Sequence, residues 1–403
     1  MRTFATVPFF LDWSLMFSSF PRVFCAGLFL LGVTTSVLAA SGDQSNDDCP
    51  EKRLNELSRR LLAEGSITLP TNHLERELWR DLQDNHLDSF SLLEGALIAS
   101  HGGCTLAELD EAKKIFSTIL QQQRNEFEAE PRSFQGDDFS KAKKIFDRMF
   151  QNVLTGTYRA HNSDLYKTLT EGDYNCVTSS VVFALLAERE GLPVVWEAQP
   201  GHLRCFLIGS SPLPIETTCV DWFSQWEASR TKGQDHFSFS GVDTNIGRMG
   251  TPNEPIRRFD KATEVLATIY YNRGLCALQE QDFSQATFFF CQSLFLAPDD
   301  PQARLNLLAT LNNRAIRKVA EKKYAQGATL LKLGREYFPD YEPFVTNDLY
   351  LHEQWIHSLI FSKDHRFAQK LINECQRRYS DRPALFVEEE GYLLRAEPTS
   401  GKW

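Results

Sequence analysis

A cysteine, a histidine and a glutamate occur in the chain in an order that suits thiol chemistry. Cys176 follows a glycine-containing turn, Gly172–Asn175, and opens an apolar helical run. The unpaired N–H groups and the dipole at the start of a helix favour negative charge, so a thiolate is favoured at this position. His202 lies beyond that run at the start of a strand-like segment, and Glu216 lies on the next such segment. These residue types predict a nucleophile, a general base and an orienting acid.

Antiparallel pairing of two strands can bring the side chains of His202 and Glu216 together. If they face each other directly, Cys205 faces Leu213, and Cys219 lies roughly 20 Å from Cys205 along the strands. A disulfide needs alpha carbons within about 7 Å, so this register excludes a bridge between the two cysteines. The carboxylate of Glu216 would accept a hydrogen bond from one imidazole nitrogen and stabilise the imidazolium that pairs with the thiolate.

The segments around these residues predict a helix followed by an antiparallel sheet. The apolar helical run continues from Val177 to Glu190 and stops before Gly191. The polar stretch from Phe223 to Asn253 shows no period and is interpreted as a long surface loop. Between them lie three strand-like segments separated by proline and glycine, which span Val194–Ala198, Leu203–Ile208 and Leu213–Thr218.

The chain before this region is predicted to be helical. Apolar residues recur at helical spacing from about Pro50 to Leu154. Thr105 and Glu108 predict a capping box at the start of one of these helices, just after Gly102–Gly103 ends the previous one.

Parts of the chain between about residues 155 and 225 resemble the core of bacterial transglutaminase-like proteins. The stretches that carry the resemblance are Gly172–Cys176, Leu185–Val194 and Pro200–His202. The resemblance implies a papain-like fold and acyl-transfer chemistry on an amide, with Cys176 as nucleophile and His202 as general base and acid.

The third member of the triad matches this family less closely. Ile215–Thr218 resembles the family segment that carries the acidic residue, which makes Glu216 the orienting group. The segment departs from the commonest family form, because it has glutamate where aspartate is usual and threonine where proline is usual. Asp221 is therefore kept as the alternative third member.

The last part of the chain contains an internal repeat. Gly274, Phe283, Ala286, Phe290 and Pro298 have spacings that resemble a tetratricopeptide unit, in which small residues allow two helices to pack closely. A second copy follows at a constant offset, and a looser third copy comes after it as a capping unit. The second copy is carried by Ala315, Tyr324, Gly327, Leu331 and Pro339, and the third by Trp355, Leu359, Phe367, Ala368 and Ile372. An unrelated helical bundle is the alternative.

Composition narrows the classes of partner and cofactor. The chain has 403 residues and a formal net charge of −10, which argues against a nucleic-acid-binding protein. We therefore expect a protein, peptide or small amide as partner. The nine histidines are dispersed, and His101 near Cys104 lacks further ligands, so we expect no metal and no cofactor.

The nine cysteines do not predict a disulfide framework. Three of them fall in helical patterns, where a small buried residue is the simplest interpretation: Cys276, Cys291 and Cys375. A bridge between Cys49 and Cys104 is left open.

The N-terminal segment, residues 1–39, has the order of an export signal. A positive residue, Arg22, precedes the apolar run Val23–Val33, and the small residues Val37 and Ala39 fit cleavage after Ala39. An uncleaved membrane anchor is the alternative, although the run is shorter than the ~20 apolar residues of a spanning helix. A start of translation at Met16 would give a more usual signal.

The sequence thus predicts an exported α+β protein, periplasmic or secreted from a bacterium, with a papain-like domain followed by a helical repeat array. We expect a thiol hydrolase or transamidase whose repeats bind a partner protein. The alternatives are a non-catalytic scaffold that uses the repeats and a peptidoglycan or peptide amidase. The predicted divisions are residues 1–39 as signal, 40–154 as a helical region, 155–260 as the cysteine domain, 261–390 as the repeats and 391–403 as a tail.

The export signal generates a first testable prediction. The mature chain should begin near Ala40 and be found outside the cytoplasm, because residues 1–39 have the charge and small-residue order of a cleaved signal. Cell fractionation with N-terminal sequencing checks this. Recovery of the chain from the cytosol with residues 1–39 still attached would contradict it.

Overall fold

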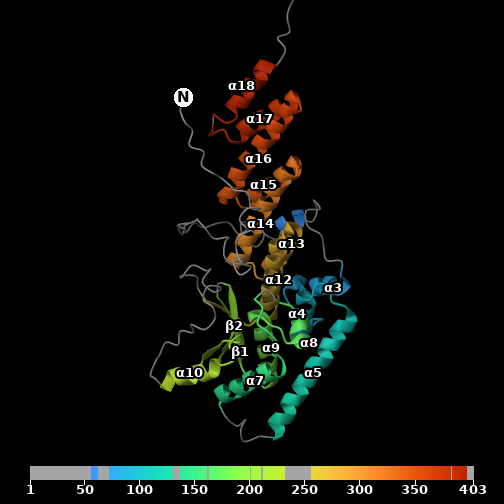
Figure 1. Cartoon of the computed structure of the whole chain (residues 1–403), viewed down its shortest axis with the longest axis vertical. Coiled ribbons are helices and arrows are strands. Elements are labelled where there is room, and N and C mark those ends of the chain that lie inside the picture. The colour runs from blue at the N-terminus through green and yellow to red at the C-terminus, as the bar shows by residue number, and fades with distance from the viewer. Residues whose placement is uncertain are drawn as a thin grey trace, which may run out of the picture.

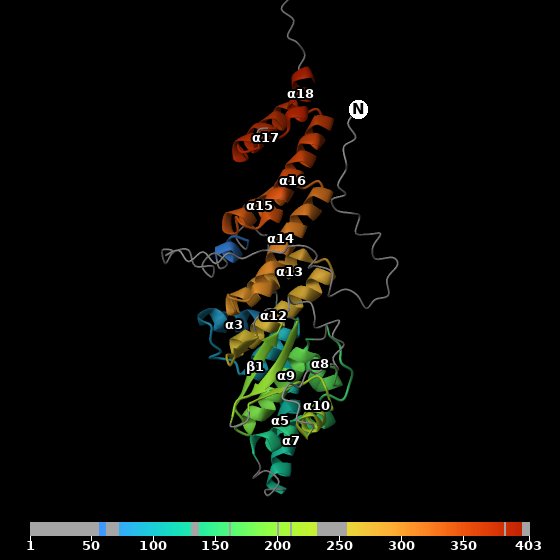
Figure 2. The ribbon, with the colours of Figure 1, turned by 90° about the vertical axis from the view of Figure 1, so that its left-hand side faces the viewer.

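A computed structural model describes residues 56–61, 72–129, 137–160, 163–199, 201–209, 212–231, 256–382 and 384–396. This part of the chain is mostly helical and contains a small antiparallel sheet, which confirms the α+β organisation. The molecule is elongated, with the sheet and the first helices at one end and a stack of helices leading to the other (Figures 1 and 2). Among the described residues, no helix is long and apolar enough to cross a membrane.

Helices precede the cysteine segment, as the apolar periodicity predicts. They are α3 (His73–Asp81), α4 (Leu92–Ser100), α5 (Leu106–Ala129), α7 (Asp138–Asn152) and α8 (Leu165–Glu171), with a short 3-10 turn, Leu82–Asp84, after α3. The predicted capping box forms at α5, because the backbone N–H of Glu108 donates to Thr105 Oγ1 at 3.2 Å and that of Thr105 donates to Glu108 Oε2 at 2.8 Å.

The cysteine segment is a helix, α9 (Cys176–Arg189), followed by strands β1 (Val194–Gln199), β2 (His202–Leu207) and β3 (Leu213–Ile215). With β4 (Arg257–Phe259), they form an antiparallel sheet in the order β3-β2-β1-β4. Helix α9 packs on β2: the hydroxyl of Ser180 donates to the carbonyl of Leu203 at 3.4 Å, and the Cys205 thiol donates to the carbonyl of Ser180 at 3.3 Å.

The register between β2 and β3 differs from our prediction. Cys205 pairs with Ile215 rather than with Leu213. The register is thus shifted by two residues, which leaves each side chain on the face of the sheet that we predicted. The predicted direct pairing of His202 with Glu216 is therefore wrong, although the side chains still meet, as described below. Cys205 and Cys219 are both free thiols, as that prediction required. Cys104 is also a free thiol, and Cys49 lies outside the described residues.

The stretch after β3 contains a helix where we predicted a loop. Helix α10 spans Trp222–Thr231, and residues 232–255 lie outside the described part of the chain. Trp222 and Phe223 are buried, and the indole of Trp222 stacks on that of Trp226 with ring centroids 5.5 Å apart. Burial of aromatic rings against the rest of the fold stabilises a helix that has no regular apolar period of its own.

Three helical pairs form the array at the other end. They are α12 (Ala262–Gln279) with α13 (Phe283–Leu296), α14 (Pro301–Ala320) with α15 (Tyr324–Tyr337), and α16 (Glu342–Phe361) with α17 (His365–Arg378). The second helices begin at Phe283, Tyr324 and His365, and this constant interval is the one that the sequence repeat predicts. A further helix, α18 (Val387–Ala396), contacts the last pair.

Each pair is joined by the same left-handed turn. Gln281, Lys322 and Lys363 have positive φ angles of 59°, 58° and 64°, and they recur at the same interval as the helices that they precede. In each turn the N–H of the following residue donates to the carbonyl five residues before it in the preceding helix, as Asp282 does to Ala277 at 2.8 Å. Three non-glycine residues in the left-handed region show that the geometry of this turn is repeated.

Small residues lie where the helices of the array touch. A Cβ added at Gly274 would lie 2.6 Å from the ring of Phe290, and one at Gly327 would lie 2.7 Å from Leu351. Ala286 is fully buried. The contact with Phe290 confirms that Gly274 lies at a helix interface, and the burial of Ala286 fits the same interface.

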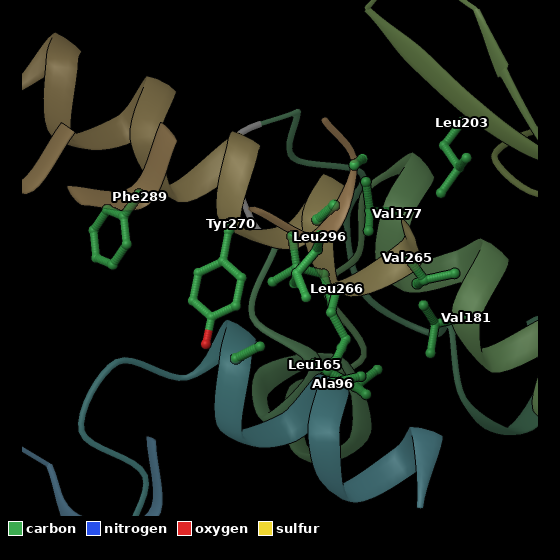
Figure 3. Packing of buried hydrophobic residues seen from close by; sticks show 14 of the residues in the cluster. Ala96, Leu165, Val177, Val181, Leu203, Val265, Leu266, Tyr270, Phe289 and Leu296 are labelled. Atoms are coloured by element: carbon green, nitrogen blue, oxygen red, sulfur yellow. The ribbon is translucent and has the colours of Figure 1, made fainter. Parts of the chain in front are cut away.

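The array and the cysteine segment share one hydrophobic core. Val265 and Leu266 of α12 lie close to Val177 and Val181 of α9 and to Ala96 of α4 (Figure 3). A second, smaller cluster lies in the last helices and contains Ile356, Ala368, Leu371, Ile372, Cys375, Phe386 and Leu393. Helix α12 is thus both the first member of the array and a packing partner of the nucleophile helix.

The close packing of α12 on α13 predicts the effect of one substitution. Ala286→Arg should destabilise the array by several kcal/mol, because it buries an unpaired charge at a fully buried position. Thermal unfolding followed by circular dichroism measures this effect. Ala325→Arg, at an exposed position of α15, is the matched control and should melt like the wild type. Equal melting of the two variants would contradict the assigned interface.

Candidate active site

The N-terminus of α9 is built around the side chain of Asn175. Its Oδ1 accepts hydrogen bonds from the N–H groups of Val177 at 2.9 Å and Thr178 at 3.0 Å. In return, the Asn175 N–H donates to Thr178 Oγ1 at 3.0 Å, which completes a capping box. Asn175 is fully buried. Cys176 is therefore held at the first position of α9, inside the protein.

A neighbouring segment lies beside this helix start. The N–H of Arg159 donates to the carbonyl of Tyr174 at 2.8 Å, and the N–H of Tyr174 donates to the carbonyl of Thr157 at 3.3 Å. The Asp173 side chain accepts from the Thr157 N–H at 2.8 Å. These bonds fix Tyr158 next to Tyr174, with ring centroids 5.8 Å apart.

His202 and Glu216 meet across the β2–β3 edge. His202 Nε2 lies 2.7 Å from Glu216 Oε2, and the two side chains are 17% and 6% exposed. Because β3 ends at Ile215, the observed register continued past that residue would place Glu216 opposite Arg204. His202 is then its diagonal neighbour, which a long side chain can reach. The two side chains therefore still meet, although the register differs from our prediction.

Glu216 is held on its other side by the chain that follows it. Its Oε1 accepts from the N–H of Thr218 at 3.2 Å and from the Thr218 hydroxyl at 2.5 Å. Thr217 Oγ1 lies 2.9 Å from the hydroxyls of both Ser179 and Ser180, so this segment is tied to α9. Thr217, which stands where the resemblance leads one to expect proline, thus anchors this segment to the helix, and Thr218 orients the carboxylate.

The electrostatics of the site favour an ion pair. Burial lowers the pKa of His202, but hydrogen bonds to Cys176 and Glu216 and the charges of both groups raise it, to about 10. Burial likewise acts to raise the pKa of Glu216, yet the hydrogen bond and the charge of His202 hold it below its ordinary value. At neutral pH the histidine is therefore an imidazolium and the glutamate a carboxylate.

Cys176 is the second neighbour of the imidazole. Glu216 binds Nε2, and Cys176 lies close enough to His202 to raise the pKa of the imidazole. The structure thus brings together all three residues that the sequence predicted. The alternative acid, Asp221, is exposed and lies just before α10. A thiol, an imidazole and a carboxylate in this order can activate a nucleophile and return a proton to a leaving group.

Tyr158 belongs to the site and was missed by the sequence analysis. Burial, followed by the charges of Cys176 and Glu216, raises the pKa of its phenol. The phenol therefore keeps its proton at neutral pH and can donate a hydrogen bond. Tyr158 is brought near Cys176 by a single β-bridge to Tyr174, two residues before the cysteine. No rule of sequence spacing predicts such a bridge. The cap by Asn175 could have been predicted from its position relative to Thr178, which is that of a capping box.

The other described cysteines lie in a different environment. Burial raises the pKa of Cys104 and of Cys291 to about 11 and that of Cys375 to about 12. It also raises the pKa of Cys205 and of Cys276. Cys291 and Cys375 are buried in helices of the array, as predicted, and Cys276 is half-buried. Cys176 differs from them because it lies beside the imidazole of His202.

One group of the described residues could offer three ligand atoms to a metal ion. Glu353, His357 and Glu389 place these atoms within 4.8 Å of one another, on α16 and α18. His357 Nε2 and Glu389 Oε1 form an ordinary ion pair at 2.9 Å. The group lies in the last helices of the array and includes none of the residues of the candidate site around Cys176.

Comparison with known proteins gives no relative. No family model, no curated protein and no solved structure matches this chain.

The raised pKa of His202 predicts how stability depends on pH. The pKa of His202 is about 10 in the folded protein, against 6.5 ordinarily, so protonated His202 stabilises the folded state. This stabilisation is complete below about pH 6.5 and is lost as pH rises toward 10. Glu216 acts oppositely, since its lowered pKa gives stability that is present above about pH 4.5 and lost on acidification. Both contributions are complete between these limits.

Melting temperatures of the wild type and of His202→Gln, measured from pH 4 to pH 10, test this prediction. The advantage of the wild type should be largest near pH 5 to 6.5 and shrink by several degrees at pH 9.5. A difference that does not change with pH would contradict the assigned ion pair.

Proposed function

We propose that the protein is a thiol enzyme of papain-like fold, similar to the transglutaminase-like superfamily, that acts on amide bonds of a protein or peptide. The observation that supports this proposal most strongly is the contact of His202 Nε2 with Glu216 Oε2 at 2.7 Å, in a largely buried site beside Cys176. Cys176 is the proposed nucleophile, His202 the general base and acid, and Glu216 the group that orients the imidazole. No cofactor is required for this chemistry.

The proposed reaction has two steps. The Cys176 thiolate attacks the amide carbonyl, and a carbon–sulfur bond forms. The imidazolium of His202 gives its proton to the leaving nitrogen as the carbon–nitrogen bond breaks, which leaves a thioester and a neutral imidazole. Water or an amine then attacks the thioester, His202 accepts a proton from it, and the thiolate is released. The acceptor decides between a hydrolase, including a peptidoglycan or peptide amidase, and a transamidase.

The start of α9 offers a donor for the oxyanion of this reaction. The N–H groups of Val177 and Thr178 are taken by Asn175 Oδ1, and that of Ser179 donates to the Asn175 carbonyl at 3.0 Å. Within the described residues the Cys176 N–H has no partner of this kind, so it can donate to an oxyanion next to the sulfur. The protonated phenol of Tyr158 is a second candidate donor.

The helical array supports the second half of the proposal. Its regular helical pairs and its small-residue contacts resemble those of a tetratricopeptide-type array, although each unit is several residues longer than the usual repeat. We propose that it binds a partner or substrate protein, as such arrays present extended surfaces. Export by the N-terminal segment remains a prediction, because residues 1–39 lie outside the described part of the chain.

A non-catalytic scaffold is the second candidate function. Cys176 is only 9% exposed, and a nucleophile that a substrate cannot reach would be inert. In that case the array alone would carry the function, and the ion pair of His202 and Glu216 would be structural.

Thiol reactivity separates the two candidates. Near neutral pH, iodoacetamide should alkylate Cys176 faster than Cys276 or Cys375, and His202→Ala should slow that alkylation at least tenfold by removing the imidazolium. Glu216→Gln should affect alkylation less and turnover of a reporter peptide amide more, because it weakens control of the imidazole tautomer. Peptide mapping by mass spectrometry gives the rate for each cysteine.

His357→Ala is the matched control for His202→Ala. His357 Nε2 also contacts a carboxylate, Glu389 Oε1 at 2.9 Å, and it belongs to α16 in the array. This variant should leave the rate at Cys176 unchanged. If Cys176 reacts no faster than Cys276 and His202→Ala has no effect, the catalytic proposal is wrong and the scaffold takes its place.

A further inference from the structure

The residue that caps the nucleophile helix is itself held by the helical array. Asn175 Nδ2 donates to Ser163 Oγ at 2.8 Å and to the carbonyl of Ala160 at 3.3 Å. From the other side, Asn272 Nδ2 of α12 donates to the same Ser163 Oγ at 2.9 Å. A row of hydrogen bonds therefore runs from the first helix of the array to the residue before Cys176.

The Ser163 hydroxyl is fully used as an acceptor in this row. A hydroxyl oxygen has two lone pairs, and the amides of Asn175 and Asn272 occupy both. Ser163 is 7% exposed, so water has little access to replace either donor. It also directly precedes Asp164, which caps α8 by accepting from the Lys167 N–H at 3.3 Å. Ser163 is thus fixed on one side by α8 and on the other by α12.

Helix α12 is anchored by several contacts at this point. Arg273, the next residue, pairs with the buried carboxylate of Glu75 and donates to the carbonyl of Ala99 at 2.7 Å. Its guanidinium lies 4.1 Å from the ring centroid of Phe289 in α13. About two turns earlier, Val265 packs against α9 and Leu266 against α4 (Figure 3). The Asn272 amide is therefore presented to Ser163 by a helix that is packed against α4, α9 and α13.

We propose that Asn272 and Ser163 are positioning residues for Cys176, so that the array sets the reactivity of the thiol as well as offering a surface. This inference rests on the proposed function of Cys176. Without the Asn272 donor, Ser163 and the Asn175 amide can turn, and Asn175 Oδ1 loosens its hold on the N–H groups of Val177 and Thr178. The first turn of α9 then opens, and the sulfur moves relative to His202. A partner that shifts α12 would act on the thiol by the same route.

Two variants that remove the link test this inference. Asn272→Leu keeps the volume and loses the donor, and it should slow alkylation of Cys176 by about tenfold, because small displacements of a reacting group are costly. It should also speed hydrogen exchange of the Val177 and Thr178 amides, a readout that does not depend on catalysis. Ser163→Ala should have the same two effects, and Ser163→Thr, which keeps the hydroxyl, should restore both.

The matched control is Asn347→Leu in α16. Asn347 is half-buried like Asn272, and its Nδ2 donates to Asn312 Oδ1 at 2.8 Å within the array, without a link to Asn175. It should lower the melting temperature about as much as Asn272→Leu and change neither alkylation nor exchange at α9. Equal effects of the two variants on Cys176 would overturn the inference.

The outcomes also separate this inference from the proposed function. If His202→Ala slows alkylation of Cys176 and Asn272→Leu does not, the positioning role alone falls. If neither variant changes a rate that already equals those of Cys276 and Cys375, the proposed function falls, and the positioning role falls with it.

Discussion

The cap that Asn175 places on α9 is the interaction on which the site depends. A helix start carries unpaired N–H groups, and burying them in a hydrophobic core is costly unless side chains satisfy them. One buried amide meets this demand: its oxygen takes the N–H groups of Val177 and Thr178, and its nitrogen bonds to Ser163 and Ala160. The first position of the helix can then be a cysteine whose sulfur lies within a protein interior rather than at its surface.

Around this cap, the charged groups are arranged by tertiary contacts from several directions. Glu216 reaches His202 diagonally from the end of β3, and Thr217 ties that end to two serines of α9. The imidazolium is stable in a buried place because a carboxylate lies on one side of it and a thiol on the other. The same contacts that orient the groups therefore decide their protonation.

Sequence patterns predicted what depends on local periods and on residue type. The order of α9 and three strands, the capping box of Thr105 and Glu108, and the regular interval of the helical pairs all follow from such patterns. The register of β3, helix α10 and the roles of Tyr158 and Asn272 could not be predicted in this way. Asn272 meets Ser163 across 109 positions of the chain, and α10 is stabilised by the burial of Trp222 and Phe223 in a core that only the fold assembles.

The shared core between α12 and α9 also bears on how such a protein can change over evolutionary time. All three helical pairs share the turn that recurs at Gln281, Lys322 and Lys363. The first pair is also fitted to the cysteine segment, because Val265, Leu266 and Asn272 of α12 are matched to α9, α4 and Ser163 (Figure 3). Duplication or loss of a unit is therefore compatible with the site only beyond α13. The array has one end at which its length can vary and one end at which it cannot.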